Sequence, residues 1–317
     1  MIRVATGTAG VLGLANIKMD TSPTVAHFMT PGRCIFDCKF CTQAKTSDAD
    51  QSLLSRISWP EFEEKDVFTA LKERQDRFKR VCLQVVHSED HEDFLGYVRK
   101  IKDVCALPIS VDLKADDIGT VRKTFEAGAD VVGLPIDVAN PKIYPKIKEG
   151  SFFLQMYLIK QAAKEFRNKI STHLMIGLGE SEKDAVYVIK EMHKVGVTTA
   201  LFAFTPIKGT SLEKMKQPAI EHYRRIQMAR FLIYNDFITN MIFDENGRIT
   251  SFGFKFEELK DKIQLSAFQT SGCPGCNRPY YNERPGGTLY NYPCTPSKEE
   301  HKKALREAMV GLGGFDG

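Results

Sequence analysis

Residues 170–204 read ISTHLMIGLGESEKDAVYVIKEMHKVGVTTALFAF, and their pattern indicates a strand, a helix and a second strand in succession. The apolar runs Ile170 to Leu178 and Thr198 to Phe204 have the length of buried strands. The charged segment between them, Glu182 to Val195, has helical periodicity, and Gly196 follows it as a stop signal. Apolar strands that alternate with helices are typical of a parallel sheet covered by helices.

The same alternation extends towards the N-terminus and predicts six strands in all. The other four strands are expected at residues 24–29, 80–87, 107–113 and 129–136, and the other helices at 60–77, 90–105, 118–127, 152–166 and 219–236. A β-hairpin is expected at 240–254, turning at Asn246-Gly247, and a last helix near 297–309. Six strand–helix units leave two arrangements open, a partly closed barrel and an open doubly wound sheet.

The composition is that of a globular protein. The chain has 317 residues, of which 43% are hydrophobic and 26% are charged, so it can bury a sizeable core. The formal net charge of +4 is too small to indicate nucleic-acid binding by itself. No run of about 18 apolar residues is present, and the N-terminus lacks the features of a signal peptide. We therefore expect a cytoplasmic protein that binds neither nucleic acid nor membrane.

Eight cysteines are the unusual feature of this composition. In a reducing compartment, clustered thiols bind metal or do chemistry more often than they cross-link. Cys34, Cys38 and Cys41 have the spacing C-x3-C-x2-C and lie in a loop directly after the first predicted strand. Three thiolates can hold three irons of a [4Fe-4S] cube and leave the fourth iron open for a ligand. Zinc and incidental thiols are the alternatives, and this spacing matches the common zinc sites poorly.

At these residues the chain resembles the radical S-adenosylmethionine superfamily, whose signature is C-x3-C-x2-C, often with an aromatic residue where Phe40 lies. The resemblance implies a [4Fe-4S] cluster on the three thiols, whose open iron chelates the amino and carboxylate groups of S-adenosylmethionine. It also implies reductive cleavage of that cofactor to methionine and a 5′-deoxyadenosyl radical, which takes hydrogen from an unactivated carbon.

The same resemblance settles the choice of fold. It implies an α/β fold whose core is a partial TIM-like barrel of six β/α units, with a C-terminal hairpin and a Cys-rich extension. We predict one domain over residues 1–236, the barrel with an N-terminal extension. A second is predicted over 237–317, containing the hairpin, the Cys-rich segment and the final helix.

Two further segments are similar to biotin and lipoyl synthases. Residues 175–181, MIGLGES, resemble the I-x-G-L-G-E-T/S segment of those enzymes, which implies that the backbone at Ile176 and Gly177 lies along the adenine. Residues 206–212, PIKGTSL, resemble their P-x-x-G-T-x-L segment. Aligned on these anchors, Asp137 is the implied ligand of the ribose hydroxyls, with a helix cap as the alternative interpretation.

The second predicted strand departs from the family pattern. It ends in Val-Val-His87-Ser88-Glu89 in place of the usual Gly-Gly-Glu, which receives the methionine amino group. Gln84, His87 and Ser88 are therefore the candidates for that contact.

Biotin synthase itself is not indicated, because it takes the ligands of a second cluster from inside the barrel. Cys82 lies at one corresponding position, but Ser171 occupies another, and residues 109–111 of the third strand contain no cysteine. We expect Cys82 and Cys105 to be buried in the core.

The C-terminal cysteines form a second motif. Cys273 and Cys276 have the C-x2-C spacing of a metal knuckle, and Cys294 follows. A zinc knuckle is one interpretation, and an auxiliary [4Fe-4S] cluster is the other, with Ser271, Ser297, Cys82 or an exogenous group as the fourth ligand. Residues 273–285, CPGCNRPYYNERP, resemble a segment carried by the subunits of two-component lipoyl synthases in many archaea and some bacteria.

That resemblance implies sulfur insertion into a protein-bound octanoyl chain. The radical would take hydrogen from C6 or C8, and the auxiliary cluster would donate sulfide. The implied partners are an octanoylated H-protein or E2 lipoyl domain, a second lipoyl synthase subunit and an electron donor such as ferredoxin or flavodoxin. Arg278 and Arg284 are candidates for positioning substrate or cluster. The alternative is another radical enzyme, biotin synthase-like or methylthiolating, whose C-terminal cysteines form a structural zinc or electron-transfer site.

Overall fold

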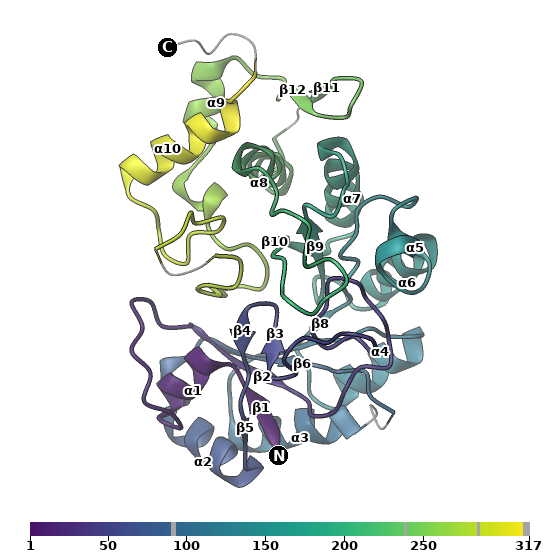
Figure 1. The fold of residues 1–317 in the computed structure, drawn as a ribbon, viewed down its shortest axis with the longest axis vertical. Helices are drawn as coiled ribbons and strands as arrows, with labels where there is room; N and C mark the ends of the chain where they lie inside the picture. Colours follow the sequence, from purple (N-terminus) through teal and green to yellow (C-terminus); the bar gives the residue numbers. More distant parts are fainter. Residues whose placement is uncertain (90–92, 238–239, 284–285, 313–317) are drawn as a thin grey trace.

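The computed structural model describes residues 1–89, 93–237, 240–283 and 286–312 and is built around one mostly parallel sheet (Figure 1). The sheet has eight strands in the order β10-β9-β8-β7-β6-β2-β1-β5, and the first six in this order are parallel neighbours. These six are β2 (Val25–Met29), β6 (Arg80–Gln84), β7 (Ile109–Asp112), β8 (Val131–Gly133), β9 (Ile170–Ile176) and β10 (Thr198–Ala203). The predicted α/β fold, with six parallel strands of a partial barrel, is confirmed.

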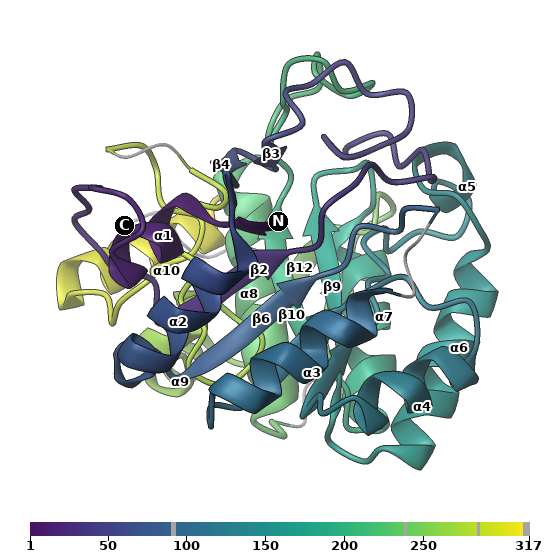
Figure 2. The same cartoon turned by 90° about the horizontal axis from the view of Figure 1, so that it is seen from below.

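Helices cover the outer face of these strands (Figure 2). They are α2 (Glu64–Arg74), α3 (Phe94–Val104), α4 (Ile118–Glu126), α6 (Phe152–Glu165), α7 (Glu182–Lys194) and α8 (Ile220–Tyr234). Local sequence fixes their ends. Helix α7 begins with a capping box between Ser181 and Asp184, and Gly196 follows its last turn at φ +72°, a conformation that glycine adopts without strain.

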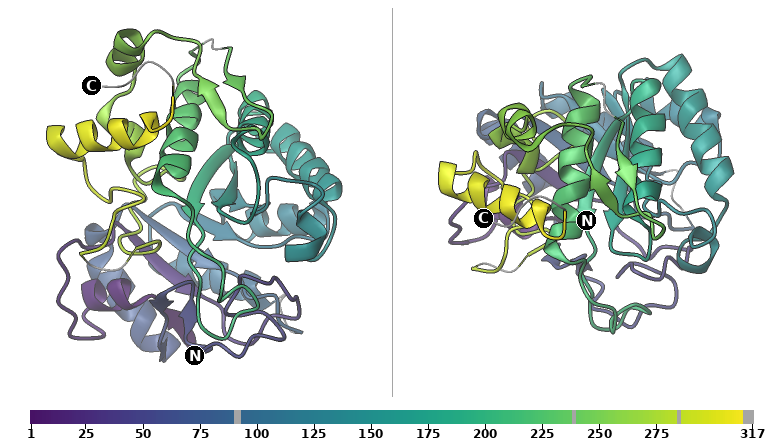
Figure 3. Two further views of the ribbon diagram at one scale, coloured as in Figure 1. Left: turned by 45° about the horizontal axis from the view of Figure 1, so that its top comes forward. Right: turned by 90° about the horizontal axis from the view of Figure 1, so that it is seen from above.

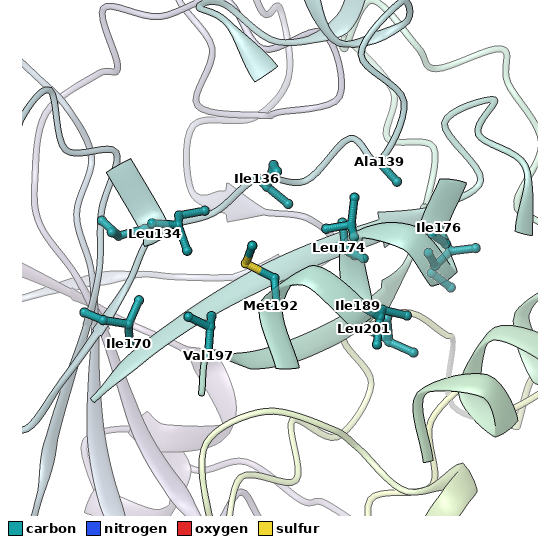
Figure 4. Packing of buried hydrophobic residues seen from close by; sticks show 14 of the residues in the cluster. Leu134, Ile136, Ala139, Ile170, Leu174, Ile176, Ile189, Met192, Val197 and Leu201 are labelled. Atoms are coloured by element: carbon teal, nitrogen blue, oxygen red, sulfur yellow. The ribbon is translucent and has the colours of Figure 1, made fainter. Parts of the chain in front are cut away.

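Alternation along each strand separates the core from the barrel interior. Leu174 of β9 and Leu201 of β10 point outward and pack with Ile189 and Met192 of α7, and all four are fully buried (Figure 4). In each strand, the residues on either side of these leucines point into the barrel, because successive side chains of a strand face opposite sides of a sheet. The outer face is therefore apolar, and the inner face is free to carry polar groups.

The N-terminal part adds elements that the sequence analysis did not predict. β1 (Ile2–Val4) pairs antiparallel with β2 and β5 (Glu61–Phe62), and α1 (Thr6–Leu12) lies between β1 and β2 in the chain. A small hairpin of β3 (Leu53–Leu54) and β4 (Ile57–Ser58) follows the cysteine-bearing loop. Strands of two or three residues show no periodicity along the sequence, which is why they were missed.

The C-terminal part packs against α8 (Figure 3). It contains the predicted hairpin, β11 (Ile242–Phe243) with β12 (Ile249–Ser251), then α9 (Phe256–Lys262), a 3-10 turn (Leu265–Phe268) and α10 (Lys298–Met309). Buried Arg224 of α8 donates to the carbonyl oxygens of Leu289 at 2.6 Å and Tyr290 at 2.7 Å, and to Glu307 Oε2 of α10 at 2.9 Å. These bonds hold the tail to the barrel.

Residues 271–282, which we call the closing segment, fill the side of the barrel between β10 and β2, two strands that do not pair. On one side, Leu201 N donates to Ser271 Oγ at 2.9 Å, and Asn282 Nδ2 donates to Ala203 O at 3.0 Å. On the other side, Thr24 N donates to Asn277 Oδ1 at 2.9 Å. The segment therefore acts as a lateral wall where the sheet is open. Of the helices in the described part of the chain, none is long and apolar enough to cross a membrane.

Candidate functional site

A cavity of about 160 Å³ lies inside the barrel, enclosed by the inner faces of the strands, the loop after β2 and the closing segment. Its polar wall is built from alternate strand residues: Arg80, Cys82 and Gln84 of β6, Ser110 and Asp112 of β7, and Ser171 and His173 of β9. This alternation places nearly every polar residue of these strands at one site, which marks the cavity as the functional centre.

The loop after β2 brings the three cysteines of the first motif together. Cys41 N donates to Cys38 O at 2.9 Å, which closes a turn, and Cys41 lines the cavity. Burial raises the pKa of Cys38 to about 11 and that of Cys41 to about 12, and Cys34 adds to both shifts by repulsion between thiolates. Thiolates in this loop therefore need a cationic partner, as the ligands of a metal cluster do.

Contacts from distant segments hold this loop. Arg3 of β1 donates to Gln43 Oε1 at 2.8 Å, and Asp48 N donates to Gly209 O at 2.9 Å. Gly209 belongs to the PIKGTSL segment, has φ +86°, and would place a Cβ atom 2.4 Å from Ala49 N. Only glycine allows this close approach, so the PIKGTSL segment supports the cysteine loop directly.

Asp137 follows β8 and lines the cavity. Its Oδ2 atom lies 2.6 Å from Nζ of Lys148, whose side chain is 3% exposed, and its backbone has the strained φ of +60°. The next helix, α5 (Tyr144–Ile147), has Ile143 at its N-cap position. The helix-cap interpretation of Asp137 is therefore wrong, and the residue is held in a left-handed conformation at the cavity, where backbone strain is typical of functional sites.

The turn after β9 is fixed by a carboxylate. Glu180 accepts hydrogen bonds from Gly177 N at 2.7 Å and Leu178 N at 2.9 Å, and Gly177 has φ +107°. Ile176 is fully buried and faces outward, so only its backbone can contribute to a binding surface. His222 of α8 lies behind this turn, with Nε2 3.6 Å from Glu180 and Nδ1 3.1 Å from Glu182.

His222 makes the stability of the fold depend on pH. Burial alone would lower its pKa, but the hydrogen bonds to Glu180 and Glu182 raise it to about 9 from 6.5. A raised pKa stabilises the protein below about pH 6.5, and that contribution disappears as the pH rises through about 9. The shift corresponds to roughly 3 kcal/mol at 1.36 kcal/mol per pKa unit. Denaturant unfolding from about pH 6 to about pH 9.5 should show this decline. The decline should be absent in His222→Gln; an unchanged profile in that variant would contradict the assignment.

The candidates for the methionine contact lie at different places. Phe40 and Gln84 line the cavity, and Gln84 Nε2 donates to Asp112 Oδ2 at 2.7 Å. His87 is buried outside the cavity lining, with its ring 4.8 Å from that of Phe36, and its carbonyl accepts from Ile35 N at 2.8 Å. Ser88 also lies outside the lining and faces the segment at Gly32. His87 and Ser88 therefore shape the cysteine loop, while Gln84 faces the cavity.

The C-terminal cysteines separate in the structure. Cys273 and Cys276 line the cavity, whereas Cys294 is exposed and is not part of the lining. The lining also includes Cys82, which is buried as expected but faces the cavity instead of the apolar core. Cys105 lies in the core, as predicted.

The predicted neighbours of these thiols have structural roles. Ser271 Oγ accepts from Leu201 N, and Ser297 caps α10. The Arg278 guanidinium lies 4.0 Å over the ring of Phe202 and lines the cavity. Arg284 lies outside the described residues.

Asp112 and His173 are cavity residues that the sequence analysis missed. Asp112 Oδ1 lies 3.4 Å from His173 Nε2, and Oδ2 accepts from Cys82 Sγ at 3.2 Å. Burial would raise the pKa of Asp112, but hydrogen bonds from His173 and its other neighbours hold it well below the usual range. A Cβ atom at Gly133 would lie 1.7 Å from Asp112 Oδ1, so the glycine leaves space for this carboxylate. In the sequence, both residues could have been predicted from the polar residues at alternate positions of their strands.

Several polar atoms of the cavity wall lack partners. Within the described part of the chain, Trp59 Nε1, Arg80 Nε, Ser171 Oγ and Tyr281 Oη are buried and make no hydrogen bond. Buried polar groups are normally paired, so the cavity is suited to a polar occupant.

Across the described residues, no three His, Cys, Asp or Glu side chains converge closely enough to hold a single metal ion.

Comparisons with known proteins agree with this geometry. The family model described as the Radical SAM superfamily matches residues 29–192. A biotin synthase of Acinetobacter baumannii (strain SDF) is 24% identical over 214 residues, covering 65% of this chain and 64% of that protein. An uncharacterized protein of Methanocaldococcus jannaschii is 24% identical over 177 residues, covering 54% of this chain and 47% of that protein. In both cases the match spans less than two thirds of the relative's length.

Solved structures share the fold. The FeFe-hydrogenase maturase HydG from Carboxydothermus hydrogenoformans superposes with a TM-score of 0.53 at 16% identity, covering 89% of this chain and 65% of that one. SuiB of Streptococcus suis bound to S-adenosylmethionine gives a TM-score of 0.51 at 14% identity, covering 68% of this chain and 48% of that one.

Proposed function

The chain belongs to the radical SAM superfamily, and on that premise we propose that it inserts sulfur into a protein-bound octanoyl chain as a subunit of a two-component lipoyl synthase. The observation that carries this proposal is the shared cavity. Cys41 of the radical motif and the C-terminal pair, Cys273 and Cys276, line the same space inside the barrel. Hydrogen abstraction and sulfur transfer take place at the same substrate carbon. Both the radical and the sulfur donor must therefore reach that carbon in a site that excludes water.

The residues present fit the cofactors of this family. Cys34, Cys38 and Cys41 would hold a [4Fe-4S] cluster, which together with S-adenosylmethionine supplies a carbon-centred radical when bound. Asp137, oriented by Lys148, offers a carboxylate to a polar occupant of the cavity. The unpaired wall atoms described above supply further hydrogen bonds to such an occupant.

The substrate side of the cavity is apolar. Met175 of β9, Phe202 of β10 and Leu54 of β3 supply hydrocarbon surface on which an alkyl chain can pack. The closing segment keeps solvent from the side of the barrel, which protects a reactive carbon from water. A carrier domain would deliver the octanoyl chain, a second subunit would act with this one, and a ferredoxin or flavodoxin would supply electrons. The auxiliary cluster on the C-terminal cysteines is the proposed sulfur donor.

A second candidate is favoured by the relatives named biotin synthase, namely sulfur insertion into a small molecule or another radical reaction. In that case the C-terminal cysteines would form a structural zinc or electron-transfer site.

One experiment separates these candidates. Protein reconstituted anaerobically is incubated with an octanoyl-lysyl peptide, S-adenosylmethionine and reductant, with and without the second subunit, and the peptide is analysed by mass spectrometry. We expect a mass gain of one sulfur atom, and none on an unacylated peptide or without S-adenosylmethionine. No gain under either condition would contradict the lipoyl assignment, and sulfur gain by dethiobiotin in a parallel reaction would support the second candidate.

A further inference from the structure

Three thiols from two distant parts of the chain share one wall of the cavity. Cys82 lies on β6 and pairs in register with Ser110 of β7, so both side chains face the interior. Ser110 Oγ donates to Cys273 Sγ at 3.4 Å, and Cys276 N donates to Cys273 O at 3.1 Å. One serine side chain therefore connects the strand position of Cys82 to the turn that carries the C-terminal pair.

The cavity lining brings the three thiols together with two arginines. Cys82, Cys273 and Cys276 all belong to this lining. Arg80 and Arg278 line the same cavity, and Arg80 Nη1 donates at 3.0 Å to Ser110 Oγ, the group that contacts Cys273. These two guanidinium groups can therefore balance the negative charge of thiolates at this site.

Cys294 does not share this environment. It is exposed, it is not part of the cavity lining, and it lies beyond the closing segment in the chain. A cluster that also used Cys294 would have to extend from the barrel interior to the surface.

We infer that Cys82, Cys273 and Cys276 form the thiolate set of a second iron–sulfur site inside the barrel, and that Cys294 is not a ligand of it. A strand cysteine and a C-x2-C turn on the closing segment supply this site from two distant parts of the chain. Three thiolates are enough to hold three irons of a [4Fe-4S] cube, as in the radical motif. The inference rests on the proposed function for its role as sulfur donor.

The test measures bound iron and acid-labile sulfide, without reference to turnover. A variant with Cys34, Cys38 and Cys41 changed to alanine removes the first cluster, so that iron bound after anaerobic reconstitution reports the second site alone. We expect about eight irons per chain in the wild type and about four in this background. Adding Cys82→Ala should remove the remaining iron and its electron paramagnetic resonance signal after reduction. Cys294→Ala and Cys105→Ala, added to the same background, should leave both unchanged.

The outcomes are distinguishable. Retention of about four irons after Cys82→Ala, or loss of iron after Cys294→Ala, would overturn the inference and leave the proposed function standing. About four irons in the wild type, with none in the background variant, would overturn both. If Cys82→Ala lowers the folded fraction by circular dichroism, Cys82→Val serves instead, since valine fills the space of the thiol and cannot bind iron. Failure of sulfur insertion with both clusters present would count against the function alone.

Discussion

Replacing Cys38 with alanine is expected to abolish the reductive cleavage of S-adenosylmethionine, lowering its rate by roughly a thousandfold or more, as the loss of one member of a catalytic unit does. Cys38 lies with Cys34 and Cys41 in the loop after β2, where Cys38 and Cys41 share one turn, and two thiolates cannot hold a cube that needs three. The rate is measured as 5′-deoxyadenosine formed with a chemical reductant under anaerobic conditions.

Cys105→Ala is the control, because Cys105 is also a free cysteine but lies buried in the core away from the cavity. It should cleave S-adenosylmethionine at the wild-type rate. Cleavage by Cys38→Ala at a comparable rate would exclude this loop as the cluster site.

Replacing Arg225 with methionine is expected to lower the free energy of unfolding by roughly 1.5–3 kcal/mol, the cost of removing one buried charged hydrogen bond from Glu182, which keeps His222 and Ile249 N as partners. Arg225 Nη2 lies 2.7 Å from Glu182 Oε1, and the side chains are 3% and 1% exposed. Glu182 also accepts from Ile249 N at 2.7 Å, so the pair joins α7, α8 and the C-terminal hairpin. Denaturant unfolding monitored by circular dichroism measures the loss.

The control is Arg122→Ala. Arg122 Nε lies 2.6 Å from Glu165 Oε1, but its side chain is 50% exposed. An exposed ion pair contributes at most about 1 kcal/mol, so this variant should unfold almost as the wild type does. Equal losses for the two arginines would show that burial does not set the strength of the Arg225–Glu182 pair.

The strands and helices of the barrel were predictable because each is long enough to show its period. The run 198–204 corresponds to β10, and 182–195 corresponds to α7, with ends that differ by one residue. β1 and β5 have three and two residues, and they form because β1 pairs with the edge of β2 and β5 pairs with β1. A local sequence pattern cannot predict a short strand whose pairing partner is distant in sequence.

For the candidate site, spacing along the chain predicts the loop thiols because they lie close in sequence, but it cannot predict residues that meet across the barrel. Cys82 is predicted in the core because free cysteines are usually buried there, and only the inward register of β6 shows that it faces the cavity. Cys294 was grouped with Cys273 and Cys276 by order in the chain, yet the fold leaves it at the surface. Asp112 was missed because residues 107–113 were treated as one apolar strand buried on both faces, which leaves no inward polar position.

The closing segment also determines when the cavity can form during synthesis. Thr24 N and Asn277 Oδ1 are joined across 253 residues, so one wall of the barrel arrives only after nearly all of the chain has left the ribosome. Contacts so distant in sequence form late, because closing the intervening loop costs entropy before the contact compensates for it. The nascent barrel therefore stays open at its side while the cysteine loop after β2 is already made. The polar interior of the barrel is therefore open from the side until the closing segment arrives.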